Sequence, residues 1–329
     1  MILFFQVLIG DQNSGQIEYY DANSNSFLKT PTNFHTARIL FLKYLSNGYM
    51  ASCSSDFSVN IFDINTWTSI RKYTLHTNWV WSLDQIDNDT IVSGSWDNTF
   101  KIWLISTGQT IRTINVGFSV ISVRVLLNGY QIICGIGRSA NNMLIYNFTT
   151  GTLAQTLSKH TSNVNAIEIL SEQYLISGSD DKVVVVWYLG SVSLGYTTKY
   201  VFTSFHTSTI YCIKRLSSTQ VASTGSDNKI IIWDWLNGKL VYTLTGHNNS
   251  LYLSSLDLYD EQTLISGSWD KTIKFWNITN GQLLQTINSD IQIDAIAMTK
   301  TSLKLFFIYS ELRLFDILYF FNPLGRFKH

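Results

Sequence analysis

The chain of 329 residues carries 23 Lys and Arg against 23 Asp and Glu, so its formal net charge is zero. Charged residues make up 14% of it, without a basic tail or a Lys/Arg cluster, which argues against nucleic-acid binding. It has no apolar run long enough to cross a membrane, and its three cysteines show no Cys-x-x-Cys spacing, which favours buried thiols in a reducing compartment. We expect an intracellular, cytoplasmic protein whose partners include neither nucleic acid nor membrane.

The first nine residues read Met-Ile-Leu-Phe-Phe-Gln-Val-Leu-Ile and could pass for the apolar part of a signal peptide. They lack a positively charged leading segment and a small-residue cleavage site. The stretch Val7–Gly10 instead aligns with Thr90–Ser93 further along the chain. We therefore interpret these residues as a strand of the fold.

Short strand-like segments separated by turns follow. The pattern is clearest in residues 79–114, with runs at Trp79–Leu83, Thr90–Ser93, Thr99–Trp103 and Thr110–Ile114. These runs are rich in β-branched and aromatic residues, and the Asp, Asn and Gly between them suit tight turns. The unit predicts four strands, and no segment shows a helical apolar period.

The same unit recurs along the whole chain at intervals near 40 residues, which is typical of a repeat architecture. A Ser-Gly-Ser-type phrase and a strand ending in Trp occur at Ser93–Trp103, Ser177–Trp187, Ser223–Trp233 and Ser266–Trp276. Counting weaker copies, the terminal aromatics are Tyr20, Phe62, Trp103, Tyr146, Trp187, Trp233, Trp276 and Phe315. We predict a single domain over 1–329, with copies at about 1–31, 35–74, 76–114, 117–157, 160–205, 206–244, 247–287 and 289–321.

A four-stranded sheet cannot bury both of its faces alone, whereas sheets packed face to face around an axis can. The predicted fold class is therefore all-β, a closed β-propeller of four-stranded antiparallel blades. Eight blades would use every aromatic marker but leave the first blade one strand short. Seven blades would combine the N-terminal strands with one strand near Ile291–Met298 and leave Ser302–His329 outside the ring. We predict eight, because seven leave the apolar residues 305–308 without a place; seven is the alternative.

The spacing of His and Trp in the strong copies resembles the WD-repeat family of β-propellers, which includes G protein β subunits. In that family a His precedes a Trp-Asp pair by about 27 residues. Here His76, His160 and His206 precede the terminal Trp of their copies by 27 residues, and His247 precedes its Trp by 29. The Asp after the aromatic is present in some copies and replaced in others, as at Leu104 and Tyr188.

The resemblance implies that each strong copy holds a hydrogen-bonded chain from Asp to His, from His to Ser and from Ser to the Trp N–H. The implied structural tetrads are His76, Ser93, Asp97, Trp103; His160, Ser177, Asp181, Trp187; His206, Ser223, Asp227, Trp233; and His247, Ser266, Asp270, Trp276. A partial set is formed by His35, Ser52, Asp56 and Phe62. Buried groups of these types need partners, so the sets are interpreted as structural.

A Ser-His-Asp hydrolase is the competing interpretation of these sets. A nucleophile is needed once rather than four times, and no Gly-x-Ser-x-Gly elbow occurs. No His-x-x-x-His or His-Glu pair suggests a metal site, and Gly137-Arg138-Ser139 is too short for a phosphate loop. We expect no catalytic residues, no cofactor and no metal.

The family resemblance also implies a partner-binding face around the central channel, on the side of the turns between second and third strands. The residues expected there are Trp79, Trp81, Trp96, Trp269, Tyr211, Tyr252, Arg38 and Asp180. Trp and Tyr are the types enriched at interface hot spots. The alternative is that Trp79 or Trp81 packs between blades as core.

The predicted function is a non-catalytic scaffold or adaptor that binds a protein or peptide on this face. Two alternatives remain: a propeller enzyme with an active site in the channel, and a detached sensor domain of a larger protein. A neutral chain also has little colloidal repulsion, so self-association remains open.

Overall fold

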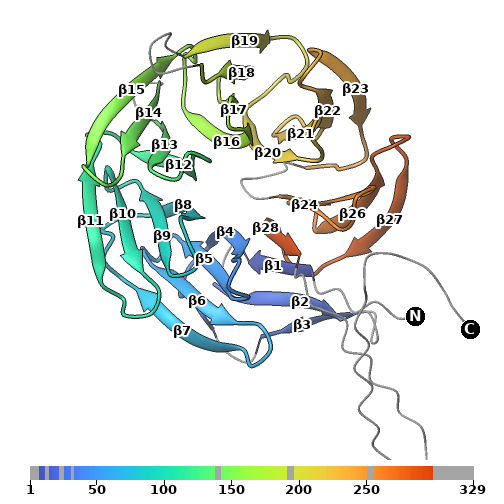
Figure 1. Ribbon diagram of the computed structural model, residues 1–329. Coiled ribbons are helices and arrows are strands. Elements are labelled where there is room, and N and C mark those ends of the chain that lie inside the picture. Colours follow the sequence, from blue (N-terminus) through green and yellow to red (C-terminus); the bar gives the residue numbers. More distant parts are fainter. Residues whose placement is uncertain are drawn as a thin grey trace, which may run out of the picture.

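The computed structural model describes residues 7–11, 15–21, 26–30, 33–137, 142–190, 196–249 and 255–298. These residues form seven four-stranded antiparallel sheets arranged in a ring (Figure 1). None of them belongs to a helix long and apolar enough to cross a membrane. Each sheet is a blade, and its first strand lies innermost, toward the central axis.

Six blades are each built from four consecutive strands, and we number these blades 1 to 6 in chain order. Blade 1 holds β4 (Ile39–Tyr44), β5 (Met50–Ser54), β6 (Val59–Asp63) and β7 (Thr68–Tyr73). Blade 2 holds β8 (Val80–Gln85), β9 (Thr90–Ser95), β10 (Thr99–Leu104) and β11 (Thr110–Asn115), and blade 3 holds β12 (Val120–Val125), β13 (Gln131–Ile136), β14 (Asn142–Asn147) and β15 (Thr152–Ser158).

The second half of the ring repeats the same order. Blade 4 holds β16 (Val164–Ser171), β17 (Tyr174–Ser179), β18 (Val184–Tyr188) and β19 (Thr197–Phe202). Blade 5 holds β20 (Ile210–Arg215), β21 (Gln220–Gly225), β22 (Ile230–Asp234) and β23 (Lys239–Leu244), and blade 6 holds β24 (Leu256–Leu258), β25 (Thr263–Gly267), β26 (Thr272–Asn277) and β27 (Leu283–Asn288).

Blade 7 is assembled from both ends of the described chain. Its order is β28 (Ile293–Met298), β1 (Val7–Asp11), β2 (Ile17–Asp21) and β3 (Ser26–Lys29). β28 pairs antiparallel with β1, with Leu8 opposite Ala297 and Gly10 opposite Ala295. This pairing closes the ring, and it places residues 7–11 in a strand as expected from the alignment with the repeats.

The prediction of eight blades is wrong, and the seven-blade alternative is right. The N-terminal sheet lacks an inner strand of its own, and β28 supplies it, so the eighth predicted copy contributes one strand to blade 7. The prediction of an eighth blade uses Phe315 as a marker although no Ser-Gly-Ser phrase precedes it. Residues 299–321 of that predicted blade, and the segment 302–329, lie outside the described residues.

Apolar side chains fill the space between neighbouring blades, so the cores are interfaces between sheets. Between blades 2 and 3, for example, Val92 and Phe100 pack with Val120 and Ile132, all fully buried. The β-branched strands predicted from sequence provide these faces because side chains alternate between the two sides of a strand.

The glycine of the Ser-Gly-Ser phrase is required by this packing. A Cβ on Gly94 would lie 2.6 Å from Val120 of the next blade, and one on Gly178 would lie 2.5 Å from Ile210. Only a residue without a side chain lets the inner strand of the following blade approach so closely. The repeated glycine is thus explained by contact between blades.

The cysteines Cys53, Cys134 and Cys212 are all free and buried in these strands. Burial raises the pKa of the Cys134 thiol to about 12 and that of Cys212 to about 11. They pack as small apolar side chains.

Candidate functional site

One end of the ring carries the turns between second and third strands together with the loops that lead into the inner strands. We call this end the top face. Four blades place a His on such a loop, a Ser on the second strand, an Asp in the turn and a Trp at the end of the third strand. The structure brings these four side chains together within blades 2, 4, 5 and 6.

The geometry within each set is nearly constant. In blade 4, His160 Nδ1 lies 2.9 Å from Asp181 Oδ2, His160 Nε2 lies 2.7 Å from Ser177 Oγ, and the Trp187 indole donates to the same Oγ at 2.8 Å. The other three sets repeat these contacts at 2.7 to 3.2 Å. They are His76, Asp97, Ser93 and Trp103; His206, Asp227, Ser223 and Trp233; and His247, Asp270, Ser266 and Trp276.

The turn carboxylate also ties the loop to the blade. Asp181 accepts the backbone N–H of Thr161, which follows the His, and that of Val183 on its own turn. Burial alone would raise the pKa of the Asp181 carboxyl, but the hydrogen bond and charge of His160 lower it below its usual value. The carboxylate therefore stays ionised, and the loop is held by charge-assisted hydrogen bonds.

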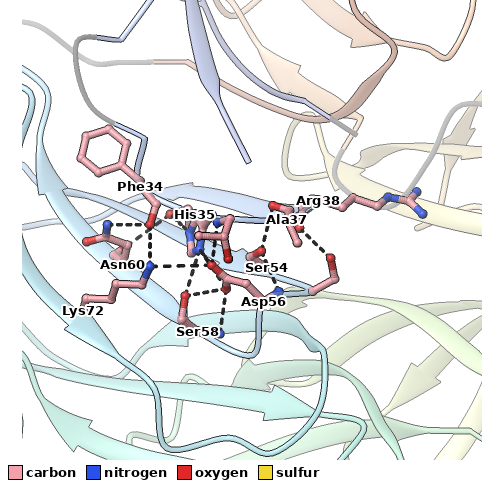
Figure 2. A network of polar contacts seen from close by, with 12 residues as sticks. Phe34, His35, Ala37, Arg38, Ser54, Asp56, Ser58, Asn60 and Lys72 are labelled. Atoms are coloured by element: carbon pink, nitrogen blue, oxygen red, sulfur yellow. Dashed lines mark hydrogen bonds and ion pairs between the residues drawn. The ribbon is translucent and has the colours of Figure 1, made fainter. Parts of the chain in front are cut away.

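Blade 1 holds the partial set, and Figure 2 shows its His35 and Asp56 with polar groups around them. His35 bonds Ser52 at 2.7 Å and Asp56 at 3.1 Å, and Ser58 lies 3.0 Å from the same imidazole. Phe62 replaces the Trp, so no indole reaches Ser52. Lys72 approaches Asp56 at 3.7 Å and donates to the Phe34 carbonyl.

Blades 3 and 7 differ from this pattern. At the second-strand position where the other blades have the Ser, blade 3 has Cys134, opposite Val123. Blade 7 has Ile9 at that position. The polar sets are thus a property of blades 1, 2, 4, 5 and 6.

These sets are arranged as hydrogen-bonding hubs within the blades. In each complete set the Ser side chain is fully buried, and its Oγ accepts the indole N–H while contacting the imidazole. Among the described residues, no group of three His, Cys, Asp or Glu side chains is arranged to hold a metal ion.

Three of the aromatic residues expected on the top face, Trp79, Trp81 and Trp96, lie against one another. Trp79 and Trp96 stack with centroids 5.0 Å apart and planes at 9°, and Trp81 lies 4.7 Å from Trp96. Trp81 is 6% exposed and packs with Leu40, whereas Trp79 and Trp96 are half-buried. We call Trp79, Trp81 and Trp96 the indole cluster.

The cluster extends across the channel. Tyr211 on β20 of blade 5 packs against the buried pair formed by Leu40 of blade 1 and Trp81 of blade 2. Blade 5 is not a neighbour of blade 1 or blade 2, so apolar side chains from opposite sides of the ring meet over the channel. The sequence left open whether these tryptophans form a contact surface or pack as core. Trp81 has the burial of a core residue, while Trp79 and Trp96 keep accessible surface.

The remaining expected residues are engaged by neighbours. Arg38 forms two bonds to Asp294, Nε to Oδ2 at 2.7 Å and Nη2 to Oδ1 at 2.6 Å. The Trp269 indole donates to Asp294 Oδ1 at 2.7 Å, and the Arg38 guanidinium lies over the Trp269 ring at 5.3 Å.

Asp180 accepts the side-chain amides of Asn163 and Asn165, at 2.9 and 2.7 Å. Tyr252 lies outside the described residues. The sequence did not identify Asp294 as the residue that joins Arg38 to Trp269, because the three residues belong to three different blades.

Known proteins with the same repeat support the assignment of the fold. The family described as "WD domain, G-beta repeat" matches residues 67–103, 151–188, 197–234 and 238–277. The chain is 26% identical over 199 residues to the U3 small nucleolar RNA-associated protein 15 homolog of Gallus gallus, covering 59% of this chain and 38% of that protein.

Two further relatives have other names. The F-box/WD repeat-containing protein 9 of Bos taurus is 29% identical over 167 residues, covering 46% of this chain and 35% of the relative. Autophagy-related protein 16 of Arabidopsis thaliana is 25% identical over 223 residues, covering 67% of this chain and 33% of the relative. The chain thus spans between 33% and 38% of the length of these three relatives. The four matched repeats, set in a ring of four-stranded sheets, confirm the resemblance, and the chain belongs to the WD-repeat family of β-propellers.

Proposed function

We propose that this protein is a non-catalytic scaffold that binds a protein or peptide on its top face, over the mouth of the channel. The observation that carries the proposal is the indole cluster, in which two stacked tryptophans remain half-buried beside a buried third. Tryptophan anchors at the centre of an interface commonly supply most of its binding energy.

The packing beneath the cluster supports a surface site. Leu40, Trp81 and Tyr211 meet over the channel, so a partner would rest on these side chains. A surface backed by packed side chains changes little on binding, which reduces the entropy cost of association.

Of the predicted contact residues, Trp79 and Trp96 carry most of the proposal. Arg38 and Trp269 already share Asp294, and Asp180 is held by two asparagines, so these three form the polar edge of the surface. Polar groups at the edge of an interface contribute less than a central aromatic anchor.

The family and the cysteines support a protein partner and a location inside the cell. The WD-repeat family is typical of protein-interaction scaffolds, and the free buried cysteines suit a reducing compartment inside the cell. We propose a location inside the cell and do not specify the cytoplasm, because one relative is named for a small nucleolar RNA.

The test is a double substitution, Trp79→Ala with Trp96→Ala. Proteins are co-purified from extract with the natural chain and with the variant and compared by quantitative mass spectrometry. Half of each extract is treated with nuclease, so that a partner held through RNA is recognised. With the purified partner we expect the variant to raise the Kd about 30-fold, as for loss of a hot spot worth about 2 kcal/mol.

The matched control is Tyr130→Ala, which removes an aromatic that is 43% exposed on the loop between β12 and β13, at the opposite end of the ring. This variant should bind like the natural chain. If the double variant binds normally, the proposal is wrong. If it loses its cooperative unfolding transition instead, the tryptophans are core.

A further inference from the structure

The lower part of the channel carries a ring of charges that alternate in sign from blade to blade. Each inner strand from β4 to β24 has one residue that lies opposite the tetrad serine, or its equivalent, on the second strand. The next residue along each of these inner strands is charged. In blade order these residues are Lys43, Asp84, Arg124, Glu168, Lys214 and Asp257. We call them the charge ring.

Three ion pairs link neighbouring blades within the ring. Lys43 Nζ lies 2.7 Å from Asp84 across the boundary between blades 1 and 2, and Lys214 Nζ lies 2.7 Å from Asp257 between blades 5 and 6. Arg124 and Glu168 approach to 3.7 Å between blades 3 and 4.

The acidic members also bond to the blade that follows them. Asp84 accepts the backbone N–H of Val125 at 2.8 Å, Asp257 that of Met298 at 2.9 Å, and Glu168 that of Arg215 at 3.4 Å. Each acid therefore joins the cation of the preceding blade to the backbone of the next. Six of the seven blade boundaries receive one such polar link.

The seventh boundary, between blades 7 and 1, receives none from the charge ring. The equivalent residue on β28 is Ala297, which lies between Asp257 of blade 6 and Lys43 of blade 1 in the ring order. Seven positions on a closed ring cannot alternate in sign throughout, because an odd number leaves two like charges side by side. An uncharged residue removes that repulsion, and here it stands in the blade assembled from both chain ends.

A different contact holds this boundary, at the top of the channel. Arg38 of blade 1 makes its two bonds to Asp294 of blade 7, whose side chain is fully buried. Trp269 of blade 6 donates to the same carboxylate. Below it the boundary has apolar packing, including Leu8 and Ile39 in one core. Figure 1 shows β28 and β1 beside β4 at this junction.

We propose that the propeller opens at the boundary between blades 7 and 1, and that the Arg38–Asp294 pair is the latch that keeps this boundary closed. The other six boundaries each have a polar link at the level of the charge ring, which the boundary between blades 7 and 1 lacks. β28 and β1 separate from blade 1 once the latch is released.

The test is native-state hydrogen exchange of the full chain, read by mass spectrometry, with the variant Asp294→Asn. This change keeps the size of the side chain and removes its charge. We expect exchange in β1 and β28 to rise about tenfold or more, since removing one member of a buried ion pair is strongly destabilising. Exchange in β16 and β17 of blade 4 should change by less than about twofold, because local opening leaves distant blades intact.

The matched control is Arg124→Met, which breaks the ring ion pair between blades 3 and 4. It should speed exchange in β12 and β16 and leave β1 and β28 unchanged. The latch is refuted if Asp294→Asn speeds exchange equally in all blades, or if Arg124→Met opens β1 and β28 as much as Asp294→Asn does.

Two measurements keep the test valid should Asp294→Asn fail to fold. Arg38→Lys retains the charge but loses the two-pronged geometry, and it should raise exchange in β1 and β28 to a smaller extent. In the natural chain these two strands should already exchange faster than β8 and β9. Slower exchange of β1 and β28 than of β8 and β9 would overturn the proposal.

Discussion

A single residue at the tip of the blade 1 turn has an unfavourable backbone conformation. Phe57 has a φ of 69°, in the left-handed region, and its side chain is 40% exposed. Equivalent turns place Asn98 at 68° and Asn228 at 62°. Asn adopts this conformation readily, whereas a bulky side chain is strained there.

Replacing Phe57 by Asn should therefore stabilise the protein by about 1 kcal/mol, because the relieved strain exceeds the lost contact of a partly exposed ring. Chemical denaturation of the natural chain and the variant measures the difference. The reciprocal change Asn98→Phe in blade 2 should destabilise by a similar amount. A loss of stability with Phe57→Asn would show that the ring contributes more than the strain costs.

At the scale of the blade, the tetrads explain why one serine matters more in some blades than in others. Ser177 bonds both His160 and Trp187, whereas in blade 1 Phe62 takes the place of the Trp, so that set has no indole for Ser52. Both serines are fully buried. The cost of removing a hub depends on how many buried polar groups it leaves without a partner.

We expect Ser177→Ala to destabilise the protein by about 1–3 kcal/mol more than Ser52→Ala, since only the former leaves a buried indole N–H unpaired. Urea denaturation midpoints of the two variants provide the comparison, and the two substitutions remove the same hydroxyl. Equal losses in both blades would mean that the Trp N–H contributes nothing to the set.

For the whole molecule, the repeated His–Asp pairs predict how stability depends on pH. Burial alone would raise the pKa values of Asp56, Asp97 and Asp270, but the hydrogen bonds and charges of their histidines lower them below the usual 3.8. Burial lowers the pKa values of His35 and His247 below 6.5, although their carboxylate partners raise them.

The unfolded chain therefore binds more protons than the folded chain at both kinds of group, and stability falls as pH falls. We expect the denaturation midpoint to be constant above about pH 7, to decline below 6.5 as His35 and His247 resist protonation, and to decline more steeply below 3.8 as the carboxylates do. Midpoints measured from pH 8 to pH 3 test this. A midpoint that rises on acidification would contradict it.

The repeat unit itself could be recognised in the sequence because its signals are local. Strand-forming runs, turn residues and the His–Trp spacing recur within single copies, so the four-stranded blade and the members of each tetrad were identified by position alone. The hydrogen bonds within each tetrad were implied by the resemblance to the WD-repeat family, because the His lies on a loop and the Asp in a turn, outside the paired strands.

The closure of the ring and the contacts at its mouth depended on the tertiary structure. Whether β28 completes the N-terminal sheet or begins another blade is decided by strand pairing between opposite ends of the chain, which no local pattern encodes. Arg38 meets Asp294 across 256 positions of sequence, and Tyr211 meets Trp81 across the channel, for the same reason. Local signals in the chain are therefore enough to predict the repeating blade. The number of blades, and the contacts between side chains of distant blades near the axis, depend on the folded ring, because those contacts form only once the sheets are packed around one centre.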